Sequence, residues 1–324
     1  MLVSVIVVNW NGAPHLRRCL AALRSQQFRD FEAIVVDNGS SDGSDEIVTR
    51  EFPEFRLLPQ TANLGFAAAN NFGARAARGE WLALLNNDAF AEPDWLARLA
   101  QATRDYPDCA GFASGQLSDA DPSRLDGAGD SYHSIGLAWR SGRGQPFGPP
   151  WDAPRAVFAP CAAAALYRRA RFLDAGGFDE TFFCYFEDVD LAFRLGLQGG
   201  RFMYIPGARV RHVGSASHGQ ASDFARYHGH RNLVWTFVKN MPASLLWRYL
   251  PGHILFNLLS LIVFTLAGQP GALWRAKWHA LKGLPRVLRE RRALQAQRTA
   301  PAADLDKLMV HGLWALVRRH RLKG

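Results

Sequence analysis

The stretch that decides the fold is Trp81-Leu82-Ala83-Leu84-Leu85-Asn86-Asn87-Asp88, an apolar run that ends in three polar residues. Its apolar part suits a strand buried on both faces. In open α/β sheets, ligands bind beyond the carboxyl ends of such strands. A carboxylate with amide oxygens beside it could hold a hard divalent cation there. Taken alone, the stretch favours a purely structural interpretation, a strand followed by an Asx-type turn and a helix capped by Pro93.

Strand and helix patterns alternate on both sides of this stretch. Apolar runs at Val3–Asn9, Phe31–Asp37 and Arg56–Pro59 are each followed by a segment with helical spacing, and a further helix runs from Pro93 to about Arg104. This order predicts an α/β fold with a mostly parallel sheet and helices on both faces. The strand-to-helix turns then share one edge, which would gather Asn9, Asp37, Asn63 and Asp88 in one crevice.

The middle of the chain, residues 117–160, is rich in Gly, Pro and Ser and has no clear period. It is predicted to be a long functional loop or an edge-strand region. Regularity returns with a strand at Ala162–Tyr167 and a helix that Gly176 and Gly177 end. A short strand is expected at Phe202–Ile205.

A second acidic segment follows the aromatic run Phe182-Phe183-Cys184-Tyr185-Phe186. Glu187, Asp188 and Asp190 lie at the start of a predicted helix. Acidic residues are common in a first helical turn, where they face the positive end of the helix dipole. Three acids in four positions beside aromatic residues also favour a shifted pKa, and with it a chemical role.

The net charge of +9 is unevenly distributed. Residues 1–225 carry 21 Lys and Arg against 26 Asp and Glu, whereas residues 226–324 carry 17 against 3. A nucleic-acid-binding module would interleave basic and stacking residues in a recognisable motif, and none is found. Basic residues beside an apolar helix instead favour an anionic membrane surface as the partner.

The most apolar segment is Gly252–Gly268, which carries no charged residue and is slightly short for a simple spanning helix. Trp247 and Trp274 flank it like residues of an interfacial belt. We favour an in-plane or re-entrant helix, with a true span and a soluble packing helix as alternatives. Basic helices are expected at Leu281–Arg298 and Leu305–Arg321.

Several classes of protein are disfavoured by the sequence. The four scattered cysteines suggest neither a disulfide framework nor a zinc ribbon, and the N-terminus reads as a first strand and not as a signal peptide. G-x-G-x-x-G, Walker and G-x-S-x-G motifs are missing, which argues against a dinucleotide oxidoreductase, a P-loop NTPase and a serine hydrolase.

Five segments in order resemble family 2 glycosyltransferases, with the bacterial rhamnosyltransferase-like branch as the nearest likeness. The segments are Val3–Asn11, Val35–Gly43, Asn63–Asn71, Leu84–Asp88 and Phe186–Leu191. The resemblance covers about residues 1–240 and implies a GT-A catalytic domain there. The charge and apolar pattern described above predict a basic, apolar helical region over 241–324. It implies inverting transfer from a nucleotide-diphospho-sugar, dTDP-rhamnose by preference, to a polyprenyl-linked or glycan acceptor at the cytoplasmic face of the bacterial inner membrane, on which the protein would be peripheral or monotopic.

The resemblance also assigns roles to single residues. Asp37 and Asp42 would contact the base and ribose of the donor, with Asn9 and Asn87 beside them, and Asn63, Gly65 and Asn70 would shape the wall near the diphosphate and sugar. Asp88 would be the metal-binding end of the family's DXD motif, whose first acidic position is Asn86 in this chain.

Mg²⁺ or Mn²⁺ would then arrive with the donor phosphates, and His212 matches a position that can supply a further ligand. Asp188 would be the general base, Glu187 would help to position the acceptor or the base, and Asp190 would pair within its helix. Transfer to a polyprenyl phosphate, another sugar such as galactofuranose or N-acetylglucosamine, and a non-catalytic assembly scaffold that binds sugar nucleotides remain as alternatives.

Overall fold

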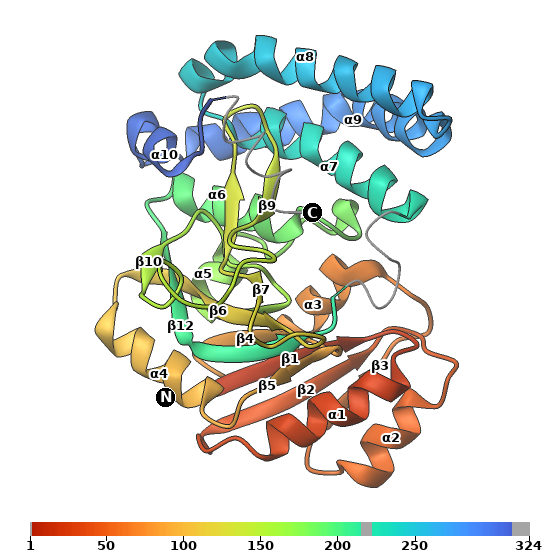
Figure 1. Ribbon diagram of the computed structural model, residues 1–324, viewed down its shortest axis with the longest axis vertical. Helices are drawn as coiled ribbons and strands as arrows, with labels where there is room; N and C mark the ends of the chain where they lie inside the picture. The colour runs from red at the N-terminus through yellow and green to blue at the C-terminus, as the bar shows by residue number, and fades with distance from the viewer. Residues whose placement is uncertain (1, 215–221, 313–324) are drawn as a thin grey trace.

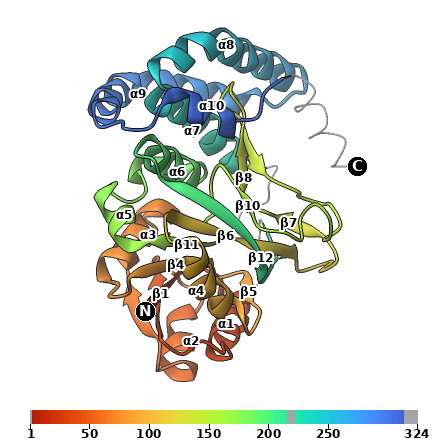
Figure 2. The same cartoon turned by 90° about the vertical axis from the view of Figure 1, so that its left-hand side faces the viewer.

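The computed structural model describes residues 2–214 and 222–312. A sheet with helices on both faces forms one end of the molecule, and helices from the C-terminal part of the chain form a layer at the other end (Figures 1 and 2). The helices are α1 (Ala13–Arg24), α2 (Ser44–Glu51), α3 (Gly65–Ala76), α4 (Trp95–Asp105), α5 (Arg169–Asp174), α6 (Glu187–Leu197), α7 (Asp223–Asn240), α8 (Ala243–Leu266), α9 (Pro270–Ala296) and α10 (Ala302–Leu308), with a 3-10 turn η1 at Glu180–Phe182.

The main sheet has the strand order β10-β12-β6-β11-β4-β1-β2-β3, with β5 paired to β12 and β7 to β6. The strands are β1 (Val3–Asn9), β2 (Phe31–Asp37), β3 (Arg56–Pro59), β4 (Trp81–Asn86), β5 (Ala89–Ala91), β6 (Cys109–Ser118), β7 (Leu125–Gly127), β8 (Asp130–Tyr132), β9 (Ala138–Arg140), β10 (Arg155–Ala156), β11 (Ala164–Arg168) and β12 (Arg201–His212). Strands β4, β1, β2 and β3 are parallel, and β11 runs antiparallel between β4 and β6. The predicted mostly parallel sheet is therefore confirmed.

Register brings three strand ends to one edge of this sheet. Asn9 of β1 pairs with Asp37 of β2, and Val8 pairs with Asn86 of β4.

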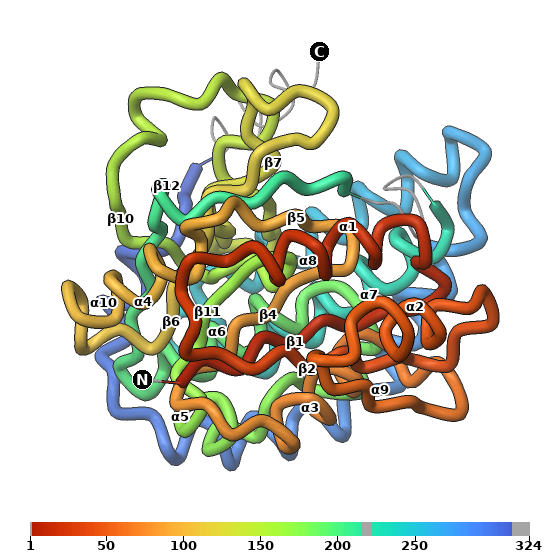
Figure 3. Tube along the Cα trace, turned by 90° about the horizontal axis from the view of Figure 1, so that it is seen from below, coloured from red at the N-terminus to blue at the C-terminus, as the bar shows by residue number. Residues whose placement is uncertain are grey.

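The two faces of β1 pack against different hydrophobic cores. Val5 and Val7 pack with α1, α2 and α4, whereas Ile6 belongs to the cluster that includes α3, α5 and α6. Seen from below, α1 and α2 cover one face of the first strands (Figure 3).

The region 117–160 is an edge-strand region, one of the two predicted forms. Of its short strands, β7 pairs with β6 and β10 pairs with β12 in the main sheet, whereas β8 and β9 form a separate two-stranded sheet. The strand expected at Phe202–Ile205 is longer than predicted, because β12 continues to His212 after an irregularity between Ile205 and Arg209. Pro206 lies in that irregularity and has no N–H for the ladder, which explains why the sequence pattern breaks there.

The C-terminal helices are also longer than predicted. The apolar segment lies within α8, and most of the predicted basic helix at Leu281–Arg298 forms the second half of α9. Of the helix expected at Leu305–Arg321, only the part in α10 falls among the described residues. Met241 and Leu245 are buried in the same core cluster as the sheet, so this region packs directly on the rest of the chain.

Among the described residues, α8 is the helix long and apolar enough to cross a membrane by length and composition. One of its sides is exposed, with Leu255, Val263 and Leu266 at 57%, 60% and 83%. Trp274 and Trp278 of α9 are also more than half exposed. A soluble packing helix would bury such residues, so this alternative from the sequence is disfavoured.

Candidate active site

The ends of β1, β2 and β4 are joined by side-chain hydrogen bonds. Asn9 Nδ2 donates to Asp37 Oδ1 at 3.2 Å, and Asn87 Nδ2 donates to Asn9 Oδ1 at 2.7 Å. The second Asp37 oxygen accepts from the backbone N–H of Ser40 at 3.1 Å. Residues from three strand ends thus lie together, as parallel register requires.

Asp42 lies in the loop before α2, against the start of α1. Its Oδ2 accepts from the backbone N–H of Ala13 at 2.9 Å, and its Oδ1 accepts from the Ser44 hydroxyl. Burial would raise the pKa of Asp42, but the hydrogen bonds from Ser44 and Ala13 outweigh it and lower the pKa. The carboxylate is therefore ionised at neutral pH.

Asn63 and Gly65 shape the entrance to α3. Asn63 Oδ1 accepts from Asn38 Nδ2 and from the N–H of Gly65, each at 2.9 Å. Gly65 has φ +85°, and a Cβ at this position would lie 2.6 Å from the ring of Phe183. Asn70 is buried, with its amide donating to the Phe66 carbonyl one turn earlier at 2.9 Å.

Asp88 lies against His212, the last residue of β12. Asp88 Oδ1 is 3.2 Å from His212 Nε2, and His212 Nδ1 is 2.7 Å from Oδ2 of Asp126 on β7. Burial opposes charge on the ring, but the hydrogen bonds that the ring makes to the Asp126 and Asp88 carboxylates outweigh it and raise the pKa of His212. The same contacts hold the pKa of Asp88 low, and with Arg140 they lower that of Asp126 to about 2, in both cases against the effect of burial.

These residues fit a divalent cation. An imidazole oriented by a carboxylate on its other nitrogen is a common arrangement at metal sites. Asp88 adds a hard oxygen, and the Oδ1 atom of Asn86 is buried without a hydrogen-bond partner among the described residues. Asn86 Nδ2 is 3.5 Å from His212 Nε2. If the side-chain amide of Asn86 is flipped, so that Oδ1 and Nδ2 exchange positions, Oδ1 lies beside His212 Nε2. Such oxygen and nitrogen donors suit Mg²⁺ or Mn²⁺.

The second acidic segment begins α6. Asp188 Oδ2 accepts from the N–H of Ala162 at 3.0 Å, and Oδ1 accepts from the N–H of Val189 at 2.8 Å. Burial raises the pKa of Asp188, and these two N–H groups oppose the rise. Glu187 is 5% exposed, and burial followed by the charge of Asp188 raises its pKa well above the usual range.

Asp190 has the internal role expected of it. It accepts from Arg194 Nε, one turn later, at 2.8 Å, and its other oxygen lies 2.8 Å from Lys239 Nζ. With the carboxylate neutralised and fully buried, Asp190 is a structural anchor for α6.

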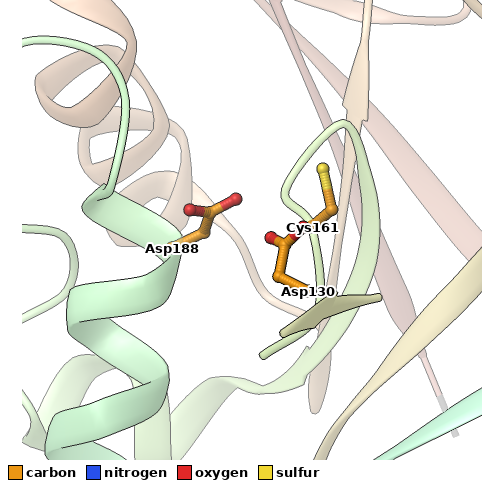
Figure 4. Close-up of side chains that lie close together, drawn as sticks. All are labelled: Asp130, Cys161 and Asp188. Atoms are coloured by element: carbon orange, nitrogen blue, oxygen red, sulfur yellow. The ribbon is translucent and has the colours of Figure 1, made fainter. Parts of the chain in front are cut away.

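A third carboxylate faces Asp188 from β8. Ligand atoms of Asp130, Cys161 and Asp188 all lie within 4.8 Å of one another, and Figure 4 shows the Asp188 carboxylate pointing from α6 toward the other two side chains. Burial and the charge of Asp188 raise the pKa of Asp130 well above its usual range. Burial also raises the pKa of the Cys161 thiol to about 12.

The backbone just before Asp188 is strained. Phe183, Tyr185 and Phe186 have φ of 65°, 70° and 70°. Phe183 also has ψ −59°, and the N–H of Cys184 donates to the Phe182 carbonyl at 2.8 Å, which is a γ-turn of the rare, strained hand. Each such residue costs about 1–3 kcal/mol and persists only where its surroundings enforce it.

Three residues of this site were not identified from the sequence: Asp126, Asp130 and Arg140. The available signal was two acids four residues apart in the glycine-rich run Leu125-Asp126-Gly127-Ala128-Gly129-Asp130. A functional loop was one of the two forms expected for this region, but its three-residue strands are too short to show a period that would orient any side chain.

A cavity of about 730 Å³ lies elsewhere, where α10 covers the C-terminal end of α6 and the first residues of β6 and β12. Its lining is mainly apolar, with Phe158, Phe193 and Leu305 among the residues. None of the candidate catalytic, donor-binding or metal-binding residues lines it.

Known proteins resemble this chain in sequence and in fold. The sequence model of Glycosyl transferase family 2 matches residues 4–171. The chain is 32% identical over 252 residues to N-acetylglucosaminyl-diphospho-decaprenol L-rhamnosyltransferase of Mycobacterium tuberculosis, which covers 70% of this chain and 81% of that protein. It is 30% identical over 319 residues to the pre-mycofactocin glycosyltransferase of the same species, over 97% of this chain and 62% of that protein.

Solved structures support the fold. A mannosyltransferase from Pyrobaculum calidifontis in complex with GDP-Man and Mn²⁺ has a TM-score of 0.56 at 20% identity, covering 97% of this chain and 87% of that one. GalNAc-T7 with UDP, GalNAc and Mn²⁺ has a TM-score of 0.60 at 17% identity, covering 74% and 48%. The predicted GT-A fold is thereby confirmed. With the family match across residues 4–171 and the relative that is 32% identical, the chain belongs to glycosyl transferase family 2 and is a sugar-transferring enzyme.

Proposed function

We propose that this protein is an inverting glycosyltransferase that moves L-rhamnose from a dTDP- or UDP-sugar to a hydroxyl of a lipid-linked or surface-polysaccharide acceptor. One observation carries the proposal. The N–H of Asn86 donates to the Ala163 carbonyl at 2.9 Å, and Asp188 accepts from the N–H of Ala162 at 3.0 Å. Two acidic segments about a hundred residues apart therefore flank the same short piece of chain.

The donor side of the crevice supports a nucleotide-diphospho-sugar. Asp37 and Asp42 are acceptors suited to base N–H groups and ribose hydroxyls, and Asn9 and Asn87 fix the strand ends beside them. Rhamnose is our preferred sugar because the relative from Mycobacterium tuberculosis is named an L-rhamnosyltransferase. Its name also contains a diphospho-decaprenol, which supports a lipid-linked acceptor here.

In the reaction, the acceptor oxygen attacks the anomeric carbon while the bond from that carbon to the donor phosphate breaks. The nucleoside diphosphate leaves with the bonding electrons, and the hydroxyl proton passes to Asp188. Attack opposite to the leaving group inverts the configuration. Asp188 suits this role because the N–H groups of Ala162 and Val189 stabilise its charged form.

Asp130 and Glu187 have a supporting role. Three carboxyl groups so close together in a buried place, those of Asp130, Glu187 and Asp188, cannot all be ionised. We therefore assign one proton to Asp130 and one to Glu187. In that state each carboxylic acid can donate a hydrogen bond to the acceptor or to the base, and Asp188 alone is charged.

Asp88 and His212 would hold a divalent cation, with Asn86 as a further oxygen donor. A bound Mg²⁺ or Mn²⁺ would neutralise the diphosphate as negative charge develops on it. Asp126 contributes by fixing the orientation of the His212 ring.

The exposed face of α8 and α9 supports membrane association, which we place at the cytoplasmic face of the bacterial inner membrane. Leu255, Leu258 and Val263 of α8 are exposed, and so are Trp274 and Trp278 of the neighbouring helix α9. Arg275 and Lys282 occur in the same part of α9, and basic residues beside exposed tryptophans suit an anionic headgroup region. With the enzyme placed there, a polyprenyl-linked acceptor would reach it by diffusion within the membrane.

The test is a transfer assay with a panel of donors and acceptors. Purified enzyme would be given dTDP-L-rhamnose, UDP-galactofuranose or UDP-N-acetylglucosamine, with and without Mn²⁺. The acceptors are N-acetylglucosaminyl-diphospho-polyprenol and polyprenyl phosphate. Mass spectrometry should find rhamnosylated lipid from the first donor and the first acceptor. Transfer of another sugar, or transfer to polyprenyl phosphate alone, would favour the alternatives that the sequence left open.

A further inference from the structure

The strained backbone before Asp188 lies against α7, and one side chain of that helix contacts it repeatedly. Asn232 Nδ2 lies 3.0 Å from the Phe182 carbonyl oxygen, 3.0 Å from that of Cys184 and 2.8 Å from that of Tyr185. The side chain is fully buried. One amide group therefore gathers three carbonyls of the turn into a small space.

Arg231 holds the same backbone and orients Asn232. Its NH2 group donates to the carbonyls of Thr181 and Phe182 at 3.0 and 2.9 Å. Its Nε donates to Asn232 Oδ1 at 2.9 Å. Since an N–H donor requires the amide oxygen on that side, the amide nitrogen of Asn232 faces the turn.

The same helix also holds the chain beyond Asp188. Lys239 Nζ lies 2.8 Å from one Asp190 oxygen, and Asn240 Nδ2 donates to that oxygen at 2.8 Å. Lys239 also pairs with Asp179, which precedes the turn, at 2.7 Å. Contacts from α7 thus bracket Asp188 on both sides.

Bulky residues such as Phe and Tyr do not adopt positive φ without an external cause. When the amide of Asn232 is removed, the carbonyls of Cys184 and Tyr185 lose this donor in a place that water reaches poorly, while the Phe182 carbonyl keeps its bond from Arg231. A return to extended φ values then lowers the free energy of this backbone, and that return moves the start of α6. A shift of about 1 Å at a catalytic group can lower a rate about 10²-fold.

We propose that Asn232, oriented by Arg231, is a positioning residue that keeps the Phe183–Phe186 turn left-handed and so sets where the Asp188 carboxylate meets the acceptor hydroxyl. This inference rests on the proposed role of Asp188 as the base. It makes α7 a functional part of the catalytic site, although no residue of α7 was singled out from the sequence.

The test compares steady-state kinetics of Asn232→Ala with those of the wild type. We expect kcat for transfer to fall about 10²-fold while the Kd of the nucleotide-sugar, from calorimetry, stays within twofold. The acidic limb of the pH–kcat profile should move to lower pH, because an Asp188 released from its buried position is better hydrated. Asn232→Asp keeps the side-chain size but removes the donor, so it should behave like Asn232→Ala.

The matched control is Asn71→Ala. Asn71 is also a buried asparagine that bonds the backbone of this connection, but it does so at Phe178, ahead of the strained turn. We expect it to lower the melting temperature while kcat and the pH profile stay near those of the wild type. An equal loss of kcat and an equal pH shift in Asn71→Ala would overturn the proposal. The effect would then come from general destabilisation of this connection and not from the turn before Asp188.

Two further variants keep the outcome clear. If Asn232→Ala does not fold, Arg231→Lys is the milder change. It should lower kcat and shift the pH profile in the same directions, by smaller amounts. Full kcat in every folded variant of Asn232 and Arg231 would overturn the inference. Asp188→Asn, measured in parallel, separates this failure from that of the proposed function, since substantial transfer by Asp188→Asn refutes the base assignment itself.

Discussion

His212 Nδ1 lies 2.7 Å from Asp126 Oδ2, and this contact turns the other ring nitrogen toward Asp88. The two residues come from β12 and β7, which both pair with β6. The geometry of the proposed metal site is therefore determined partly by a residue that is not one of its proposed ligands.

Substitution of Asp126 by Asn should weaken Mn²⁺-dependent donor binding about 10–100-fold, the usual effect of losing a carboxylate that orients a metal-binding imidazole. Mn²⁺ titration of donor affinity by calorimetry measures this effect. Asp121→Asn is the control, because Asp121 is an exposed acid of the same region that bonds only locally, to Ser123 and Arg124. Unchanged Mn²⁺ dependence in Asp126→Asn would contradict the assignment of His212.

Replacement of Asp188 by Asn should lower kcat for transfer about 10²–10⁴-fold, the range expected for loss of a general base. The Kd of the donor should change little, because the Asp188 side chain bonds backbone N–H groups on the acceptor side of the crevice. Single-turnover transfer and donor calorimetry on the same preparation separate the two quantities. A variant with more than a tenth of wild-type turnover would show that another group takes the proton.

Asp130 gives a prediction about stability and pH. Its pKa in the folded protein is raised well above the value of about 3.9 for an exposed aspartate, so the folded state keeps a proton that the unfolded state loses. The free energy of unfolding should then fall as pH rises above about 4 and up to the folded pKa.

Asp130→Asn removes this titration, so its melting temperature should exceed that of the wild type at pH 8. The difference should shrink toward pH 4, where aspartate is protonated in both states. Thermal unfolding across this range measures the effect, with Asp108→Asn as an exposed-acid control. A melting temperature below that of the wild type at pH 8 would mean that Asp130 is ionised and favourably paired in the folded state.

Membrane association should depend on the exposed apolar residues of α8. Leu258→Glu together with Val263→Glu should abolish flotation with vesicles of phosphatidylglycerol and phosphatidylethanolamine, because both side chains are at least half exposed and their loss leaves the fold intact. Leu308→Glu on α10, where the side chain is 41% exposed, is a control of similar chemistry on a different helix. Equal flotation of all three proteins would rule out this face of α8 as the contact.

Point substitutions are preferable to removing the chain from Met241 onward. The N–H of the Trp235 indole donates to the Ala280 carbonyl of α9 at 3.0 Å, and Val287 of α9 belongs to the same apolar cluster. Deletion would expose this side of α7 and thereby disturb the support of the Asp188 turn, so release from membranes would be confounded with unfolding.

The sequence predicted the features that follow from parallel strands. Asn9, Asp37 and Asp88 could be expected at one edge because each follows an apolar strand, and register alone brings such ends together. Asp126 and Asp130 could not be placed, since their strands are three residues long and their neighbours are set by tertiary contacts. The turn at Phe183–Phe186 runs against the local preferences of its residues, so only the packing of α7 reveals it.

Gly65 has a consequence for any attempt to recombine relatives of this enzyme. Its Cα lies so close to Phe183 that a methyl group would strike the ring, and the N–H of Ala67 donates to the Phe183 carbonyl at 3.2 Å. The start of α3, beside the proposed donor pocket, and the turn that precedes the proposed base are therefore in direct contact. A chimera that takes its first hundred residues from one enzyme and the remainder from another must therefore inherit both sides of this junction as a matched pair. A mismatched pair would disturb donor binding and turnover together, so the chimera could not change the sugar alone.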